Sequence, residues 1–268
     1  ATLVKSEARV TILGVPDVPG SSFAVFSKIA AKNVTVDMIV QNVAADGRAD
    51  ISFTVVRDDL PQTLKAVEEA VAELGAEGFT SDENVSKASV VGQGMASQTG
   101  VAQKMFRSLA DAGINIQMIT TSEIKISVLV DREQGAAALR TVHQAFELHK
   151  APADVSSGTA ATGGAHPTAA PSEPAEVVAR LQNVAGMEDL TIDDIALDDT
   201  QARLTISGVP DAPGIAAQVF ERIAKDEIFV DMIVQSFGRV GKANLSLTVP
   251  RGDLPKALQT AEDLVKDR

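Results

Sequence analysis

Apolar and polar residues follow the same order three times along this chain. In the first stretch, residues 10–15 have the apolar character of a buried strand, and a Pro-Gly turn then introduces a predicted helix over residues 20–32. Val25, Phe26 and Ile29 fall on one face of that helix, as the apolar stripe of an amphipathic helix requires. The pattern therefore predicts a strand followed by a helix that packs on it.

The next segment, residues 34–40, alternates strictly between apolar and polar positions. Alternation with a period of two is typical of a strand with one buried face. We therefore expect every second residue from Val34 to Val40 to face the core. The side chains of Asp37 and Gln41 are expected to share the opposite, open face, as are those of their later counterparts, Asp231 and Gln235.

A turn at residues 46–47, a strand over 49–55, a helix over 60–74 and a short strand near 78–81 complete the first stretch. The predicted order is βαββαβ. This is the ferredoxin-like plan of the α+β class, in which an antiparallel four-stranded sheet carries both helices on one face.

The sequence of residues 9–41 returns at residues 203–235 without insertion, and 19 of the 33 positions are identical at a constant offset of 194. A weaker copy occupies residues 87–119, at an offset of 80. The repeat predicts three modules. We place them at residues 1–82, 83–150 and 177–268, with a flexible linker rich in Ala, Pro, Gly, Ser and Thr over residues 151–176.

The third module runs out after its second helix. Its fourth strand is either the apolar segment of residues 190–196 or a continuation that this chain lacks. The chain also begins in what reads as the middle of an element, which indicates a fragment or a processed product. Modules of this size have marginal cores, so pairing within the chain and homo-oligomerisation are expected.

Composition and charge disfavour several kinds of ligand and site. The formal net charge is −12, from 36 acidic and 24 basic residues, which disfavours polyphosphate ligands. The chain has no cysteine and three scattered histidines, so we expect no disulfide, no metal site and no cofactor of its own. No apolar run reaches the roughly 18 residues that span a bilayer, and the N-terminal residues do not read as a signal peptide. A soluble, cytoplasmic protein is the expectation.

Two function classes fit poorly. A nucleic-acid module on this fold would show aromatic stacking residues and a basic surface, whereas this chain has no Trp and no Tyr. A stand-alone enzyme would show paired carboxylates, a triad or a metal cluster, and none is discernible. The segment Gly92-Gln93-Gly94 lacks the Lys-Ser/Thr of a phosphate loop and reads as a turn.

The turns before the helices suit a free amino acid. A helix that begins at Gly20 or Gly214 presents unpaired N–H groups to a carboxylate. Asp17 and Asp211, just ahead of those glycines, can accept bonds from an ammonium group. Gln41 and Gln235 can donate and accept at the end of the following strand, although a single segment of this kind could equally be a core strand with a solvated Asp.

The motifs GVPDVPG (residues 14–20), GVPDAPG (208–214) and VDMIVQ (36–41 and 230–235) closely resemble the ACT domains of the regulatory portion of bacterial aspartate kinases. The second module adds GINIQMITTSEIKISVLV (113–130) and ALRTVHQAFEL (138–148), which are similar to the stretches that close that family's last ACT domain. The resemblance covers residues 5–148, the span of a separately made regulatory subunit, and residues 190–268 as a further copy.

The resemblance implies a chain that binds lysine and/or threonine at interfaces between ACT domains and so mediates feedback inhibition of aspartate kinase. The partner would be a kinase domain or catalytic subunit, to which ATP and Mg would belong. Matched motif by motif, the implied effector-binding residues are Asp17, Gly20, Ser22, Thr35, Val36, Asp37, Gln41, Val101, Ala102, Asn115, Ile116, Ser122, Asp211, Gly214, Asp231 and Gln235.

Several positions depart from the family pattern. Gln98-Thr99-Gly100 stands where His-Pro-Gly is usual, and in the third module Ser236 replaces Asn42 and Asn244 replaces Asp50. The second module is the expected partner of the first, and the third is expected to lack a partner with the TTSEI motif. The alternative function is an array of ACT domains that only oligomerises or senses another amino acid, without a kinase role.

Overall fold

The computed structural model describes residues 1–43, 47–92, 100–122, 124–150, 197–236 and 241–266. The chain divides into two compact units, of which the first comprises Ala1–His149 and Thr200–Arg268. The second unit is Lys150–Asp199, and most of it lies outside the described residues. The linker predicted over residues 151–176 and the strand predicted over residues 190–196 therefore lie outside them too.

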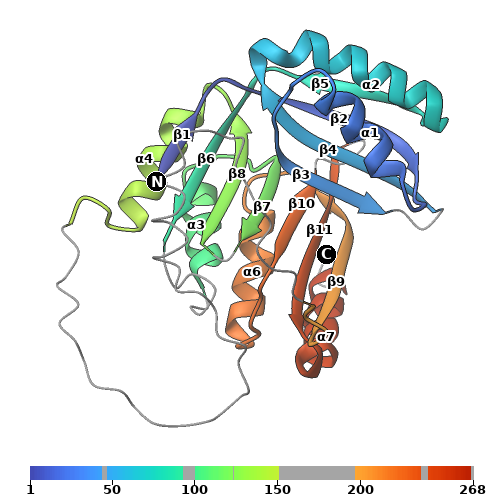
Figure 1. Cartoon of the computed structure of the whole chain (residues 1–268). Helices are drawn as coiled ribbons and strands as arrows, with labels where there is room; N and C mark the ends of the chain where they lie inside the picture. Colours follow the sequence, from blue (N-terminus) through green and yellow to red (C-terminus); the bar gives the residue numbers. More distant parts are fainter. Residues whose placement is uncertain (44–46, 93–99, 123, 151–196, 237–240, 267–268) are drawn as a thin grey trace. The chain divides into compact units, whose positions relative to one another are not determined.

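The first module folds in the predicted order, as an antiparallel four-stranded sheet with two helices (Figure 1). Its elements are β2 (Glu7–Pro16), α1 (Ser21–Ala30), β3 (Val36–Val43), β4 (Arg48–Val56), η1 (Arg57–Asp59), α2 (Leu60–Leu74) and β5 (Gly78–Asp82). The strand order is β3-β4-β2-β5. The short strand expected near residues 78–81 is β5, which pairs with β2 and completes the βαββαβ plan.

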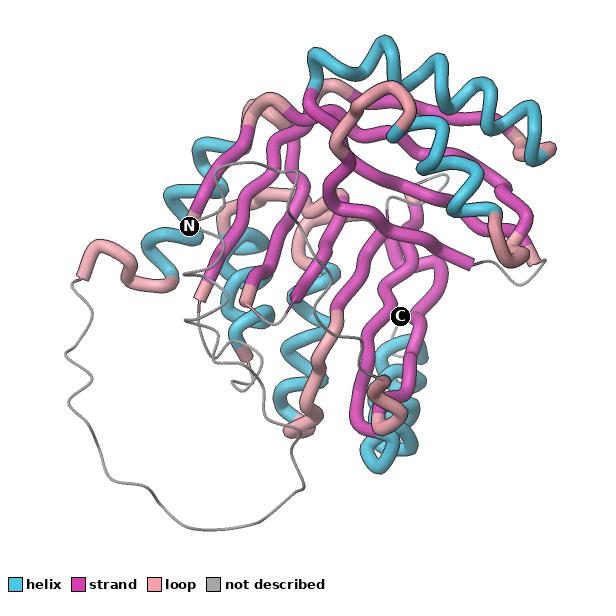
Figure 2. The backbone as a smooth tube through the Cα atoms, in the orientation of Figure 1, coloured by secondary structure: helices cyan, strands magenta, loops and turns pink. Residues whose placement is uncertain are grey.

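The second and third modules share one seven-stranded sheet, ordered β1-β6-β8-β7-β10-β11-β9 among the described residues (Figure 2). The elements of the second module are β6 (Val85–Val91), α3 (Val101–Asp111), β7 (Met118–Ser122), β8 (Lys125–Asp131) and α4 (Gly135–Ala145). Those of the third are β9 (Gln201–Pro210), α6 (Ile215–Lys225), β10 (Ile233–Ser236), β11 (Lys242–Pro250), η4 (Arg251–Asp253) and α7 (Leu254–Lys266).

The third module has a partner, contrary to the sequence-based expectation. Strand β10 pairs antiparallel with β7, which carries the TTS of the TTSEI motif. The backbone N–H of Ile233 also donates to Thr121 Oγ1 at 2.8 Å. Pairing satisfies backbone groups along the two strand edges, and it joins two small modules into one larger sheet.

Strand β1 (Thr2–Val4) lies within the residues predicted for the first module, yet it pairs with β6 of the second. Leu3 lies opposite Ala88 in this antiparallel pair. The second module supplies three strands of its own, β6, β7 and β8, so β1 fills the fourth place of its half-sheet. At the other end of the sheet, β9 is the last of the described strands.

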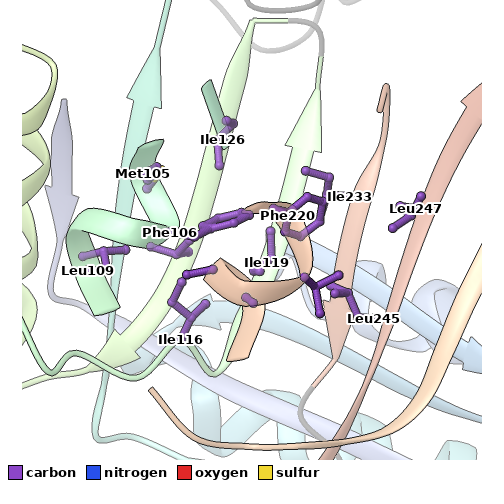
Figure 3. Packing of buried hydrophobic residues seen from close by; sticks show 14 of the residues in the cluster. Met105, Phe106, Leu109, Ile116, Ile119, Ile126, Phe220, Ile233, Leu245 and Leu247 are labelled. Atoms are coloured by element: carbon purple, nitrogen blue, oxygen red, sulfur yellow. The ribbon is translucent and has the colours of Figure 1, made fainter. Parts of the chain in front are cut away.

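Three apolar clusters hold these layers together. The helices α1 and α2 cover one face of the four-stranded sheet, around Phe53 and Ile12. The four described α-helices of the second and third modules cover one face of the seven-stranded sheet in a single cluster, with Phe106 and Phe220 at 5.2 Å between ring centroids (Figure 3). The third cluster lies where the sheet of the first module meets that of the second, and it contains Met38, Val40, Val85, Met118 and Leu129.

Buried and exposed residues alternate over residues 34–40 as predicted, but the expectation that the buried side chains share one face is wrong. The register of β3 against β4 shifts between Asp37 and Val40, and Met38 is left-handed with φ 46°. This β-bulge inserts residues without partners, so the side chains before and after it exchange faces. Val34 and Val36 pack in the core of the first module, whereas Met38 and Val40 pack in the cluster between the two sheets.

As a result Asp37 and Gln41 do not share a face. Asp37 lies opposite Thr54, and Gln41 lies opposite Ile51, which belongs to the core under the helices. In the third module, Gln235 likewise lies opposite a core residue, Leu245. Met232 is the counterpart of Met38 at the repeat offset, yet it is 48% exposed.

Candidate functional site

A pocket lies where the third module joins the second, at the start of α6. Gly214 caps this helix with φ 89°, and the loop before it is held by a bond from the backbone N–H of Asp211 to the carbonyl of Gly241. We call this the Asp211 pocket. It is lined by Phe106, Ile114, Asn115, Ile116, Val209, Pro210, Asp211, Ala212, Gly214, Ile215, Ala216, Ala217, Gln235 and Leu245.

Two polar contacts join the modules at this pocket. Asn115 Nδ2 of the second module donates to Asp211 Oδ1 of the third at 2.9 Å, and Gln235 Nε2 donates to the carbonyl of Ile116 at 3.0 Å. The space that remains is about 20 Å³, which is room for about one water molecule. A larger ligand therefore enters only when these two hydrogen bonds break and their groups bind the ligand instead.

The groups that line the pocket match the two ends of a free amino acid. The N–H groups of Ala216 and Ala217 lie in the first turn of α6 and have no acceptor within the helix, which suits a carboxylate. The carboxylate of Asp211 and the carbonyl of Ile116 are acceptors that suit an ammonium group. Phe106 and Leu245 belong to the apolar core and form an apolar wall.

The first module carries a similar group of residues, which we call the Asp17 cluster. Gln41 Nε2 donates to Asp17 Oδ1 at 3.1 Å, and Ser22 Oγ donates to Gln41 Oε1 at 3.0 Å. Gly20 caps α1 with φ 95°. This cluster is exposed, and so is Phe23 beside it, with 77% of its surface accessible. The fold thus brings together four of the residues predicted from the sequence in this module.

Other predicted residues lie outside these two groups. Thr35 is exposed just ahead of β3, and Val36 packs against the core of the first module. Val101 and Ala102 open α3 and pack against the shared core, and Ser122 ends β7. Asp37 lies on the face away from the helices. Asp231 precedes β10, and its backbone N–H donates to the carbonyl of Thr248.

Asp37 binds a residue that the sequence did not single out. Lys87 of β6 reaches both Glu7 Oε1 and Asp37 Oδ2 at 2.5 Å, with only 9% of its side chain exposed. Burial disfavours the charged forms of Lys87 and Asp37. The bonds nevertheless prevail, so the pKa of Lys87 is raised, and the pKa of Asp37 is lowered by its bonds from Lys87 and from the Met38 N–H.

The sequence did not single out Arg9 either. Its Nη1 donates to Gln117 Oε1 at 2.8 Å, and its Nη2 contacts Asp82 Oδ2 at 3.3 Å. Arg9 and Gln117 are 108 residues apart in sequence. Arg9 recurs as Arg203 in the repeat, but that recurrence indicates only a polar strand face and carries no information on the partner.

The remaining sequence expectations concern metals and membranes. Within the described ranges, no group of three or more His, Cys, Asp or Glu side chains could hold a metal ion. None of the described helices is long and apolar enough to cross a bilayer. The segments at residues 93–94 and 98–99, where a turn and a departure from the family loop were noted, lie outside the described residues.

Family models of the ACT domain match residues 9–72 of the first module and residues 89–146 and 204–264 of the other two. A chain of the crystal structure of aspartokinase alpha and beta subunits is 47% identical, with 96% of that chain and 55% of this one covered at a TM-score of 0.51. This chain belongs to the ACT-domain regulatory regions of aspartate kinases. Its tandem ACT domains have the antiparallel α+β fold expected from the sequence.

Two further relatives show how much of this regulatory region is shared. The aspartate kinase of Stutzerimonas stutzeri is 50% identical over 144 residues, which are 54% of this chain and 35% of that protein. The crystal structure of aspartate kinase from Synechocystis covers 99% of this chain at 31% identity and a TM-score of 0.78, over 42% of its own length. The ACT region thus spans about a third of the curated aspartokinases that it matches.

Proposed function

We propose that this ACT region binds a free amino acid, lysine or threonine, in the Asp211 pocket and thereby controls the activity of an aspartate kinase catalytic domain. The supporting observation is the convergence of Asp211, Asn115, Ile116 and Gln235 at the start of α6. These groups come from two modules, so a ligand held by them stabilises one arrangement of the module pair. A coupling free energy of about 1 to 3 kcal/mol is typical of such effects.

The regulatory step follows from the two contacts that cross the pocket. A ligand ammonium takes the place of Asn115 Nδ2 at Asp211, and this frees the amide of Asn115 to contact the ligand or solvent. The module arrangement that favours this exchange becomes more populated when the amino acid is present. The Asp17 cluster also combines an Asp, a Gln and a glycine that caps a helix, and it is the second candidate binding group.

Binding is tested by isothermal titration of the 268-residue chain with lysine, threonine and a panel of other amino acids. The native chain is expected to bind lysine or threonine. The Asp211→Asn variant is expected to bind about tenfold or more weakly, because a charge-assisted bond to the ammonium is lost. Asp111→Asn, at an exposed carboxylate paired with Arg107, is the matched control and should bind like the native chain.

The outcomes separate the alternatives. Binding of neither lysine nor threonine, with binding of another amino acid, would favour a sensor with a different effector. Equal binding by the Asp211→Asn variant and the native chain would remove the Asp211 pocket as the site. The kinase role is tested by joining the region to its catalytic domain, where the amino acid that binds should inhibit phosphorylation of aspartate.

A further inference from the structure

Three consecutive residues, 115–117, connect the Asp211 pocket to the contact with the first module. Asn115 and Ile116 bond to Asp211 and Gln235 on the pocket side. The next residue, Gln117, accepts a bond from Arg9 of the first module. Its backbone N–H donates to the carbonyl of Leu129 in β8, which ties the segment to the sheet. A change at Gln117 therefore lies one residue from the pocket contact of Ile116 and two residues from that of Asn115.

Arg9 is well suited to fix Gln117. It is 6% exposed, and its guanidinium group contacts Gln117 with one nitrogen and Asp82 with another. Burial lowers its pKa, while the nearby carboxylates of Asp82 and Asp211 act in the opposite direction. A planar guanidinium holds two acceptors in fixed directions, which a lysine cannot reproduce.

We propose that Arg9 is a positioning residue for the Asp211 pocket, through which the first module sets the orientation of residues 115–117. This inference rests on the proposed function of the pocket and adds a regulatory input to it. Arg9 does not line the pocket and does not need to touch the amino acid. It acts through Gln117, so the first module controls binding at a site formed by the other two.

The chain contains its own control for this role. Arg203 occupies the position equivalent to Arg9 in the third module, at the repeat offset of 194, and an alanine precedes the arginine in both copies. Arg203 is exposed on β9. Arg9 and Arg203 therefore occupy equivalent strand positions, but Arg9 is buried against the second module whereas Arg203 is exposed.

The experiment compares Arg9→Met with Arg203→Met in the full chain. The first readout needs no ligand: the side-chain amide signals of Asn115 and Gln235 in a ¹⁵N–¹H correlation spectrum, assigned with Asn115→Asp and Gln235→Glu variants. The second readout is the dissociation constant of lysine or threonine by isothermal titration. Arg9→Met should shift both amide signals and weaken binding about tenfold, because Gln117 loses a buried charged donor. Arg203→Met should change neither.

A double-variant cycle shows whether Arg9 acts through Gln117. Gln117→Leu should weaken binding as Arg9→Met does, and the double variant should be no weaker than either single variant. Additive losses would overturn the proposed route. Arg9→Lys keeps the charge without the planar guanidinium and should bind with intermediate affinity. If Arg9→Met does not fold, Arg9→Lys and Gln117→Leu are compared with the native chain in its place.

The two proposals fail in different ways. If the amide signals of Asn115 and Gln235 are the same in the native chain and in Arg9→Met, the positioning role is wrong even when lysine or threonine binds. If those signals move but no amino acid binds the native chain, the positioning role stands and the proposed function of the pocket is wrong.

Discussion

Lys87 joins the first and second modules through two carboxylates, Glu7 and Asp37. Removing an ammonium group from water is costly unless opposite charges replace the lost hydration. Here the side chains of Lys87 and Glu7 are 9% and 7% exposed, whereas that of Asp37 is 48% exposed. The contact is therefore a buried pair with a half-exposed third member, and Lys87 stays charged at neutral pH because its pKa is raised.

The contribution of Asp37 to stability should depend on pH. Because the pKa of Asp37 is lowered in the folded chain, its contribution is present above the usual aspartate pKa and is lost as pH falls through the lowered folded value. Lys87 behaves in the opposite sense. Because its pKa is raised, its contribution to stability is lost only at alkaline pH, as pH rises through the folded pKa. The native chain should therefore exceed Asp37→Asn in unfolding free energy by a constant amount near pH 7, of about 1 kcal/mol or less since Asp37 is half exposed.

Urea denaturation followed by far-ultraviolet circular dichroism between acid and neutral pH measures this difference. The advantage of the native chain over Asp37→Asn should disappear toward acid. Lys28→Gln, which removes a lysine paired with the exposed Glu73, serves as the control for a surface pair. An advantage that stays constant down to the lowest pH would contradict a role for the Asp37 carboxylate.

Residues such as Lys87 and Arg9 show the limit of sequence reasoning at this scale. Asp17, Ser22 and Gln41 could be grouped because a turn, a helix start and a strand end lie close together along one module. The partners of Lys87 lie 80 and 50 residues away in sequence, and those of Arg9 lie 108 and 73 residues away. Only the packing of one sheet on another brings such residues into contact.

At the scale of elements, a glycine forms the turn before the first helix of each module, α1, α3 and α6. Gly20, Gly100 and Gly214 cap their helices in the left-handed region, with φ between 88° and 95°. Residues with a Cβ rarely adopt this conformation. The sharp turn lets the helix begin directly after the loop, so that its first N–H groups lie beside Asp17 or Asp211. The Pro-Gly pairs at Gly20 and Gly214 predicted two of these helix starts from the sequence, whereas Gly100 follows a threonine.

Gly214→Ala tests this turn. A Cβ at Gly214 would meet only Ala110 Cβ at 3.8 Å, so the cost is backbone strain and not a clash. We expect the unfolding free energy to fall by about 1 to 2 kcal/mol, measured by urea denaturation. Gly252 lies outside the left-handed region, and a Cβ there would meet no atom within 4 Å, so Gly252→Ala should change stability by about 0.5 kcal/mol or less. Equal effects of the two substitutions would argue against strain at Gly214.

The bulge in β3 explains why the alternation predicted which residues are buried but not which of them share a face. Val34 and Val36 are covered by the helices of the first module, whereas Met38 and Val40 are covered by the second module. A pattern of period two cannot distinguish a bulged strand of this kind from a regular one. The bond from the Met38 N–H to Asp37 Oδ1, at 2.7 Å, stabilises the irregular backbone.

At the scale of the whole molecule, the second and third modules share a single core. Phe106 of α3 and Phe220 of α6 contact each other across the module boundary, and their cluster includes residues of all four helices. The first module has a separate core under α1 and α2. The second and third modules should therefore unfold as one cooperative unit, since neither buries its helices alone.

Phe220→Ala should lower the unfolding free energy by about 3 to 5 kcal/mol, the usual cost of truncating a buried Phe. Hydrogen exchange should increase in α3 of the second module as well as in α6, because both lose the same contact. Phe23→Ala, at a side chain that is 77% exposed, should leave both measurements close to native. Increased exchange confined to the third module would show that the two modules do not share stability.

The segment VDMIVQ occurs in two modules and separates what sequence and tertiary structure each decide. By itself the sequence determined the βαββαβ order, the number of repeats, the helix starts and the polar residues at the strand ends, because these depend on neighbours along the chain. Tertiary structure decided burial. Met38 is 5% exposed and Met232 is 48%, whereas Ile39 is 52% exposed and Ile233 is 3%. Identical residues differ because one strand is covered by a second sheet on its face, while the other is paired with β7 along its edge.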